Sequence, residues 1–298
     1  MNSDDLAVFL SVAEEGSITK AAKRLGYVPS NVTARIHQLE TETETTLFYR
    51  HSRGMTLTAT GKILVEYAQK IHHLLHNARM AVQNSDIPQG TLIIGSMETT
   101  AAVRLPKILA SYHQNYPEVN MSLVTGPTSH LVQEVLEYKL DGAFISGPIE
   151  QPELYHETIF REELVLVSEP TETETNGLIT KPILVFRSGC SYRARLEQWL
   201  LSEGIPNPRI MEFGTLEAIV GGVSAGLGVS LLPRSVISNL EMKGLLSSYP
   251  IPKQYGIVDT LLIYRRDTIF GAAFNTFLRI LKTLTSEETQ EGPVCLIS

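Results

Sequence analysis

The chain has 298 residues, which is too long for one ordinary hydrophobic core and favours two or three domains. Hydrophobic residues make up 43% and charged residues 19%, a composition typical of a soluble globular protein that excludes a disordered chain. No run approaches the ~20 apolar residues of a membrane span. The first residues lack the basic segment of a secretion signal. We therefore expect a cytoplasmic protein that has no membrane partner.

The net charge is −7, but the charge is unevenly distributed along the chain. Residues 1–89 contain nine Lys or Arg and nine Asp or Glu, so the remainder carries the whole −7. Two windows of this neutral part contain basic residues and no acidic ones, one between Glu15 and Glu40 and one between Glu44 and Glu66. Such windows in an acidic protein indicate a local surface that faces phosphate groups.

Three helices are predicted in the first 42 residues. Apolar residues at helical spacing predict a first helix that ends near Gly16 and a second, capped by Ser17, over 18–25. Gly26 breaks the chain, and a third helix follows over 29–42 with Pro at its first position. Two short helices with a tight turn between them form a helix-turn-helix, whose second helix enters the major groove of DNA.

A short hairpin is predicted within 47–58, around a basic turn at Ser52-Arg53-Gly54. Such a turn beside a recognition helix can lie along the phosphate backbone. Short polar side chains on the exposed face of the third helix can reach bases or phosphates. The alternative is that these are ordinary solvated residues, since helix-turn-helix patterns also arise by chance. The expected DNA-binding residues are Ser17, Thr19, Ser30, Asn31, Thr33, Ala34, Arg35, Arg50 and Arg53.

A long amphipathic helix is predicted from Thr60 to about Asn84. It is too long to pack against so small a domain, and such a helix is usually a dimerisation surface. His72, His73 and His76 lie on it, and a metal site at positions 72 and 76 is one interpretation. No further ligand is apparent nearby in the sequence, which favours a solvated or interfacial role, and we expect no metal.

The remaining two hundred residues alternate between strand and helix patterns. Strands are predicted over 91–95, 119–124, 141–145, 183–186, 209–213 and 228–232, and helices over 103–116, 131–138, 192–203 and 216–225. This alternation implies a parallel sheet with ligands at the carboxyl ends of its strands. Two more strand-like stretches, 162–168 and 256–264, are placed to cross between two lobes. Two lobes joined in this way make a cleft, as in periplasmic solute-binding proteins.

Residues in both halves resemble the LysR-type transcriptional regulators. In the N-terminal part they are Phe9, Glu15-Gly16-Ser17-Ile18-Thr19-Lys20-Ala21-Ala22, Leu25, Ser30-Asn31-Val32-Thr33, Ile36, Leu39-Glu40, Leu47-Phe48, Arg50, Leu57-Thr58 and Gly61. In the C-terminal part they are Leu105-Pro106, Tyr116-Pro117, Leu140-Asp141 and Gly226-Leu227-Gly228-Val229-Ser230-Leu231-Leu232-Pro233.

The resemblance implies a fold class: an N-terminal all-α winged helix-turn-helix with a linker helix, then a C-terminal α/β sensor domain of two lobes like a periplasmic binding protein. It also implies dimerisation through the linker helix and often a tetramer that bends promoter DNA. Three residues depart from the family's usual pattern, Val28 for a hydroxyl residue, Pro29 for Gln and Ala34 for Arg. Arg35 is therefore expected to take over part of the base readout.

Effectors of the family bind in the cleft, at positions after the first and second strands. Here the expected effector-binding residues are Thr99, Thr100, Thr128, Ser129, Ser146 and Cys190. Hydroxyls beside free N–H groups at helix starts suit a small carboxylate or similar anion, although Ser and Thr also cap helices without any ligand. Glu98 would repel an anion, so it either favours an effector with an amine or points outward.

Cys190 allows two interpretations. Near a helix N-terminus its pKa could be lowered, which would suit a redox sensor. The only other cysteine, Cys295, lies in the tail, so an ordinary small pocket residue is favoured.

We expect a sequence-specific transcription regulator whose promoter binding changes with a small-molecule effector. The expected domains are 1–58 (DNA-binding), 59–89 (linker helix and hinge) and 90–298 (effector-binding), with lobe I at about 90–161 and 265–285 and lobe II at about 162–264. The expected partners are double-stranded promoter DNA, the effector, further copies in a homodimer or homotetramer, and RNA polymerase.

Two other classes fit the sequence less well. An enzyme is not expected, because no metal cluster, Gly-rich phosphate loop or nucleophile elbow is present in the sequence. No cofactor is expected either. A solute-binding protein would need export and would leave the N-terminal ninety residues without a role.

Overall fold

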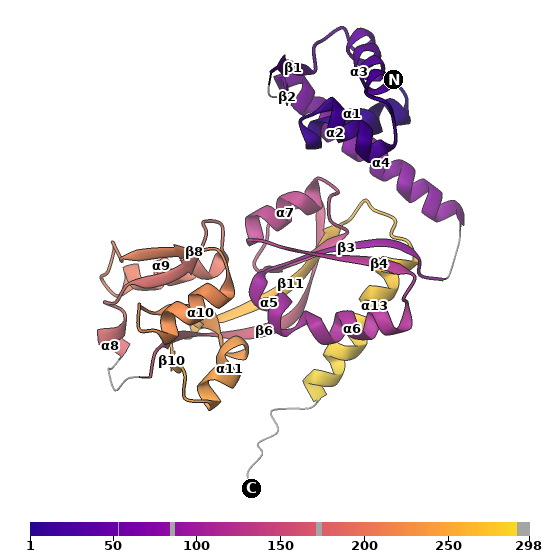
Figure 1. The fold of residues 1–298 in the computed structure, drawn as a ribbon. Helices are drawn as coiled ribbons and strands as arrows, with labels where there is room; N and C mark the ends of the chain where they lie inside the picture. Colours follow the sequence, from indigo (N-terminus) through magenta and orange to yellow (C-terminus); the bar gives the residue numbers. More distant parts are fainter. Residues whose placement is uncertain (53, 84–86, 171–174, 291–298) are drawn as a thin grey trace. The chain divides into compact units, whose positions relative to one another are not determined.

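The computed structural model describes residues 1–52, 54–83, 87–170 and 175–290. It divides into two compact units, Met1–Ser85 and Asp86–Ser298 (Figure 1).

The first unit contains three short helices, a hairpin and a long helix. They are α1 (Ser3–Glu15), α2 (Ile18–Leu25), α3 (Pro29–Glu42), β1 (Phe48–His51), β2 (Gly54–Leu57) and α4 (Ala59–Gln83). Local signals fix the helix ends. Gly16 and Gly26 end α1 and α2 in the left-handed conformation, with φ of 60° and 69°, and the Ser17 side chain caps α2 by accepting a bond from the Lys20 N–H at 3.4 Å.

The core of this unit lies between α1, α3 and the hairpin. Phe9 is fully buried, and its ring packs against Phe48 with centroids 5.3 Å apart. The apolar stripe of α3, Val32, Ile36 and Leu39, is buried in the same cluster. A Cβ at Gly61 would lie 2.2 Å from the Leu47 carbonyl oxygen, so only glycine allows α4 to begin so close to the hairpin.

Helix α4 has two apolar stripes. Leu64, Ala68 and Ile71 pack into the core of the first unit. Ile63, Tyr67 and Leu74 lie on another side of the helix and are 56%, 59% and 58% exposed. At roughly 100° per residue these three positions fall on one line along the helix. The second stripe is thus an apolar surface that the unit's own core leaves uncovered.

The second unit has two lobes joined by two long strands. Lobe I contains β3 (Gly90–Ser96), α5 (Glu98–Val103), α6 (Leu105–Asn115), β4 (Val119–Thr125), α7 (Thr128–Leu136), β5 (Gly142–Ser146) and α13 (Ala272–Gln290). Strand β3 is parallel to both β4 and β5. The helix predicted over 103–116 is α6, and the short helix α5 before it, which ends at Val103, was not predicted.

Lobe II contains a smaller arrangement of alternating elements. They are α8 (Thr175–Leu178), β7 (Ile183–Phe186), α9 (Ser191–Ser202), β8 (Ile210–Phe213), α10 (Leu216–Ser224), β9 (Ser230–Pro233), α11 (Arg234–Met242), β10 (Ser247–Pro250) and α12 (Lys253–Gly256). Strands β7 and β8 are parallel, while β9 and β10 flank the second half of β6 (Leu154–Ser168) on opposite sides.

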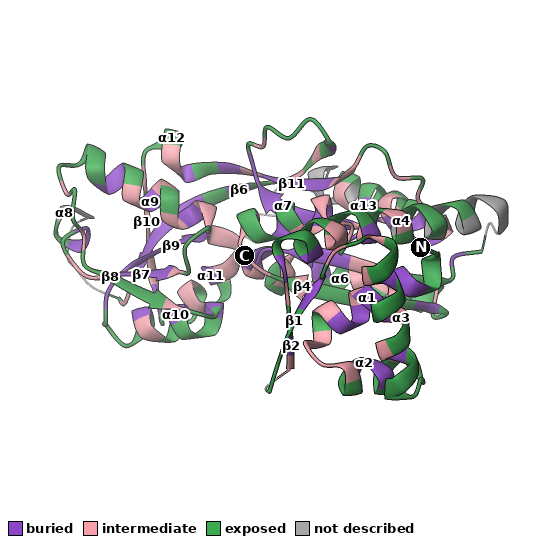
Figure 2. Ribbon diagram, turned by 90° about the horizontal axis from the view of Figure 1, so that it is seen from above, coloured by how far each residue is buried: buried purple, intermediate pink, exposed green. Residues whose placement is uncertain are grey.

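Strands β6 and β11 (Ile257–Arg265) run from one lobe to the other (Figure 1). They pair antiparallel over their shared length, from Ile257 opposite Glu163 to Arg265 opposite Leu154. The strands of the strand-helix units, β3 with β4 and β5, and β7 with β8, are parallel as predicted, and the crossing strands add antiparallel pairs that make the larger sheet mixed. The second half of β6 and the middle of β11 are buried, and Figure 2 shows much of the exposed surface on the helices. These two strands thus form the connection between the lobes.

Candidate nucleic-acid interface and ligand cavity

The first turn of α3 presents polar side chains to solvent. Ser30 and Asn31 are exposed, as is Ala34 one turn further on. No side chain caps this helix, whose N-cap is Val28. Thr33 is half-buried and its hydroxyl donates to the Pro29 carbonyl at 2.9 Å, which leaves its oxygen lone pairs as acceptors. A helix start with exposed short side chains and uncapped backbone amides is a ready site for phosphate or base edges.

Arg35 is held inside the unit instead of being free on its surface. Its Nη1 lies 2.8 Å from Oδ1 of Asp5, which is only 2% exposed, and its Nε donates to the Asn31 amide oxygen at 3.1 Å. The guanidinium also lies 5.7 Å from the centre of the Tyr27 ring. These contacts tie the recognition helix to α1. The separation of thirty residues between Arg35 and Asp5 hides the pair from sequence patterns.

Other basic residues of the acid-free windows also meet acids in space. Arg24 bonds to Glu14 at 2.5 Å and Glu15 at 3.4 Å, which raises the pKa of its guanidinium. Arg50, on β1, lies 3.4 Å from Glu40, and its side chain is 50% exposed.

Glu40 has a second role, because it accepts the backbone N–H groups of Leu47 at 2.9 Å and Phe48 at 3.3 Å. It therefore anchors the hairpin to α3 and at the same time holds Arg50 beside it.

Helix α2 and the residue that caps it add two lysines and two hydroxyl residues to the candidate DNA-binding surface. Lys20 and Lys23 are exposed on α2, and within the described residues neither forms an ion pair. The sequence prediction did not include these lysines. Thr19 is also exposed on α2, whereas the Ser17 hydroxyl is used as the helix cap. Arg53, expected at the hairpin tip, lies outside the described residues.

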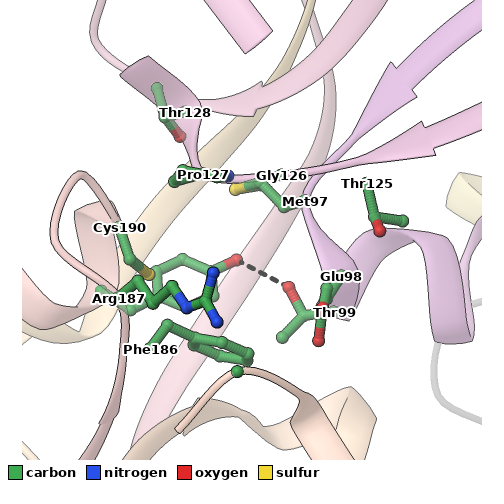
Figure 3. Close-up of a pocket in the computed structure, with 12 residues that line it drawn as sticks. Met97, Glu98, Thr99, Thr125, Gly126, Pro127, Thr128, Phe186, Arg187 and Cys190 are labelled. Atoms are coloured by element: carbon green, nitrogen blue, oxygen red, sulfur yellow. Dashed lines mark hydrogen bonds between the residues drawn. The ribbon is translucent and has the colours of Figure 1, made fainter. Parts of the chain in front are cut away.

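The second unit contains a cavity of about 180 Å³ between its lobes (Figure 3). It is lined by Met97, Glu98, Thr99, Thr125, Gly126, Pro127, Thr128, Phe186, Arg187, Cys190, Tyr192 and Gly214. Lobe I contributes the start of α5 and the segment between β4 and α7. Lobe II contributes the segment between β7 and α9 and the segment before α10. The lining thus comes from strand ends and the helix starts that follow them.

The cavity includes three of the six expected effector-binding residues, Thr99, Thr128 and Cys190. The other three lie outside its lining. Ser146 is buried behind Thr128, whose hydroxyl oxygen accepts the Ser146 N–H at 3.3 Å. Thr100 is also buried, and Ser129 faces Gly189, where an added Cβ would lie 2.5 Å from the serine oxygen.

The lining also contains Thr125, Phe186, Tyr192 and Gly214, none of which was among the six expected residues. Thr125 and Phe186 are the last residues of β4 and β7, whereas Tyr192 and Gly214 are brought to the cavity by the fold of lobe II.

Three hydrogen bonds cross between the lobes at the cavity. The Ser191 hydroxyl donates to Thr128 at 3.2 Å, and the Thr99 hydroxyl donates to Tyr192 at 3.4 Å. The Glu98 carboxylate accepts the Leu216 N–H at 2.8 Å, at the start of α10. A carboxylate at a helix N-terminus is favoured by the helix dipole. Glu98 thus points into the region between the lobes and not outward.

Two titratable groups in the cavity wall, the Cys190 thiol and the Tyr192 hydroxyl, favour their neutral forms. Burial raises the pKa of the Cys190 thiol, and two backbone hydrogen bonds at Tyr192 and Arg193 only partly oppose this effect. Burial likewise raises the pKa of Tyr192. A protonated thiol is a poor nucleophile, so the geometry favours an ordinary pocket residue over a redox sensor. Cys295, its possible partner, lies outside the described residues.

Across the ranges that the structure describes, no cluster of three or more His, Cys, Asp or Glu is arranged to hold a metal ion. The side chains of His73 and His76 lie outside the described residues. No helix in the described ranges is long and apolar enough to cross a membrane.

Comparison with known proteins assigns a family to each part of the chain. The family model described as "Bacterial regulatory helix-turn-helix protein, lysR family" matches residues 3–62. The model of the LysR substrate binding domain matches residues 85–286. The two matches cover the helix-turn-helix of the first unit and both lobes of the second.

Full-length relatives extend the likeness over almost the whole chain. The uncharacterized HTH-type transcriptional regulator YusT of Bacillus subtilis is 53% identical over 292 residues, 98% of this chain and 99% of that protein. The HTH-type transcriptional regulator GltR of the same organism is 53% identical over 281 residues, 93% of this chain and 95% of its own.

Solved structures share the fold. A full-length OxyR variant from Pseudomonas aeruginosa superposes with a TM-score of 0.73 at 20% identity, covering 96% of this chain and 94% of that one. CbnR in complex with its target DNA gives a TM-score of 0.65 at 22% identity, with 95% and 99% of the two chains covered.

Proposed function

Because the chain belongs to the LysR family of transcriptional regulators, we propose that it binds promoter DNA through the first turn of α3 and the hairpin, and that a small molecule in the cavity changes this binding. One observation carries the proposal: a helix-turn-helix and a two-lobed ligand-binding domain stand in one chain, each matched to its family model. Neither half alone would link DNA binding to a metabolite.

Ser30, Asn31, Thr33 and Ala34 are proposed to face the major groove. Their exposure at the start of α3 supports this placement. Thr19 is proposed to contact a phosphate, while Ser17 acts through the helix that it caps. Arg35 is proposed to set the angle of α3 on α1, since its guanidinium is bound to Asp5. Its contact with DNA is proposed to involve only the part of the guanidinium that faces away from Asp5.

The hairpin is proposed as the wing that follows the phosphate backbone. Arg50 supports this proposal because half of its side chain is exposed beside Glu40. A phosphate group can replace Glu40 as the partner of a half-exposed guanidinium at little cost, since exposed ion pairs are weak. Arg53 is proposed to act at the tip on sequence grounds alone.

The effector is proposed to contact Thr99, Thr128 and Cys190, with Thr100, Ser129 and Ser146 supporting them from behind. A ligand that binds one arrangement of the lobes more tightly shifts the protein toward that arrangement. If the two arrangements hold paired recognition helices at different spacing, the ligand changes the affinity for the promoter by the same linkage.

We propose that the active form is a homodimer or homotetramer built through the exposed stripe of α4, and that it acts beside RNA polymerase on promoter DNA in the cytoplasm. The functional division then follows residues 1–58, 59–89 and 90–298. Since the relatives are transcriptional regulators, we propose no enzymatic activity.

Two variants test the DNA-binding surface. Thr33→Ala should change the ranking of promoter sites by affinity, because it alters a group at the base edges. Arg50→Ala should weaken binding to all duplexes and lower the slope of log K against log salt by about one. Fluorescence anisotropy on a specific and a non-specific duplex measures both. Equal losses on every site for Thr33→Ala, or an unchanged slope for Arg50→Ala, would contradict these assignments.

A further inference from the structure

We propose that the cavity takes a small amphoteric ligand, an L-α-amino acid, with its ammonium group toward Glu98 and its carboxylate toward Arg187. This inference rests on the proposed function, in which the cavity is the effector site. It deepens that function by assigning the chemical class of the effector.

Two opposite charges line the cavity. Of its twelve lining residues, Glu98 carries a carboxylate and Arg187 a guanidinium, and the other ten are uncharged or weakly acidic. The two come from different lobes, Glu98 from the start of α5 and Arg187 from the segment after β7. Figure 3 shows the Arg187 side chain reaching into the space between Cys190 and the Glu98–Thr99 segment.

Neither charge is fully used within the protein. One oxygen of Glu98 accepts the Leu216 N–H, which leaves the other oxygen for a further donor. Arg187 has no carboxylate within ion-pair distance among the described residues, and its side chain is exposed at the cavity. The negative charge of Glu98 also acts on Cys190 on the other lobe, where it contributes to the raised pKa of the thiol.

This pair of charges disfavours the simpler ligand classes. A plain carboxylate would gain Arg187 but would approach Glu98, and a plain amine would gain Glu98 but would approach Arg187. An uncharged apolar ligand would remove water from both charges and return no hydrogen bond. An amphoteric ligand satisfies each charge with a charge-assisted hydrogen bond.

The rest of the lining fits a short molecule. A cavity of about 180 Å³ is smaller than the ~300–1,000 Å³ of pockets for drug-sized ligands. Met97, Phe186 and Tyr192 provide apolar surface for a side chain. The hydroxyl groups of Thr125 and Thr128 stand nearby as further polar contacts.

The placement of the charges on separate lobes gives the ligand a regulatory effect. A molecule held by both Glu98 and Arg187 stabilises the arrangement in which the lobes stand at this separation. A ligand with only one of the two charges would bind one lobe without holding the other.

The test is a binding screen on the full-length protein. The twenty L-amino acids are tested by thermal shift and then by calorimetry. Each amino acid that binds is compared with its amine-free acid and its carboxyl-free amine, such as 3-methylbutanoate and isobutylamine for L-valine. We expect at least one amino acid to bind, and both truncated analogues to bind about tenfold or more weakly. Binding by no amino acid, or equal binding by a truncated analogue, would overturn the proposal.

Two variants assign the charges. Glu98→Gln keeps an oxygen for the Leu216 N–H but loses the negative charge, and Arg187→Gln loses the positive charge. Each should weaken amino-acid binding about tenfold or more. Glu98→Gln should have the least effect on binding of the amine-free acid, and Arg187→Gln on binding of the carboxyl-free amine. The matched controls Glu217→Gln and Arg209→Gln change exposed residues of lobe II outside the cavity and should bind like the wild type. Loss of binding in the controls alone would contradict the site.

The same samples separate this inference from the proposed function. If an amino acid binds as described but leaves promoter affinity unchanged, the ligand class stands and the regulatory function fails. If promoter binding responds to a metabolite from a cell extract while no amino acid binds, the regulator stands and the ligand class fails.

Discussion

In the middle of α3, the recognition helix, Arg35 forms an ion pair with the buried carboxylate of Asp5 on α1. Asp5 is 2% exposed, and the Arg35 side chain is 28% exposed. Arg35→Met would leave the Asp5 carboxylate buried without its partner, so we expect the free energy of unfolding of the first unit to fall by about 2 kcal/mol. Urea denaturation measures this change.

Arg24→Met is the matched control for this prediction. Arg24 is 54% exposed and pairs with surface glutamates, so its loss should cost less than about 1 kcal/mol. If the two variants were equally stable, Asp5 and Arg35 would not form the pair that holds α3.

Cys190 gives a prediction in pH. Because burial raises the pKa of its thiol, less of it is thiolate at any given pH than in a solvated cysteine. In a Cys295→Ser background, alkylation by iodoacetamide should therefore be slow near neutral pH and should rise with a midpoint above the ordinary value of about 8.5. A rate that reaches its plateau below pH 8 would show a lowered pKa and would revive the redox interpretation.

The sequence could predict which residue types stand in each part of the molecule but not which charges meet. Arg35 and Arg24 lie in an acid-free window of the sequence, yet each bonds to an acid brought near by the packing of α1. Tertiary contacts decide such pairs, and a one-dimensional charge pattern does not contain them. The surface predicted to face DNA therefore carries less unpaired positive charge than the sequence alone indicates.

Among the elements of lobe II, two glycines make a matched test of packing. A Cβ at Gly228 would lie 2.1 Å from the Pro182 carbonyl oxygen, whereas at Gly221, inside α10, nothing lies within 4 Å. Gly228→Ala should destabilise the second unit by about 2 kcal/mol, because backbone must move. Gly221→Ala should stabilise it by about 0.5–1 kcal/mol through helix propensity.

Calorimetric unfolding of the two glycine variants provides the measurement. The same Gly→Ala change should lower the free energy of unfolding at position 228 and raise it at position 221. A stabilising Gly228→Ala would mean that β9 does not lie against the segment before β7 as described.

The helices of the first unit could be predicted closely because their ends are fixed locally. Gly16, Ser17 and Gly26 each terminate or cap a helix with their own backbone or side chain. Strand β6 was predicted only over 162–168, although it begins at Leu154. Its first half mixes polar and apolar residues and has no continuous buried run, and its partner β11 comes about a hundred residues later, so no local pattern marks it.

For the whole molecule, assembly depends on the exposed stripe of α4. Leu74→Asp places a charge in this stripe and should shift the protein toward smaller species and weaken promoter binding, since paired half-sites need paired helices. His72→Asp is the matched control, because position 72 is exposed about half a turn away from the stripe. Sedimentation velocity measures both. An unchanged size for Leu74→Asp, or equal dissociation by His72→Asp, would contradict the stripe as the contact.

Three of the six expected effector-binding residues line the cavity. Thr99, Thr128 and Cys190 follow strand ends, where parallel sheets place their ligands, and these positions can be found from strand order. Tyr192 and Gly214 also line the cavity although neither stands at a strand end. The angle between lobes depends on β6 and β11 and on the bonds across the cavity, which sequence spacing does not encode.

Selection of binding sites from genomic DNA tests whether this protein is a sequence-specific, ligand-responsive regulator. Purified protein is incubated with sheared DNA of its source organism at moderate salt, with and without a pool of L-amino acids, and the retained fragments are sequenced. We expect a few sites that share an interrupted palindrome and whose recovery changes with the pool. Recovery of no fragment above the non-specific background in both conditions, from folded protein, would contradict a sequence-specific regulator.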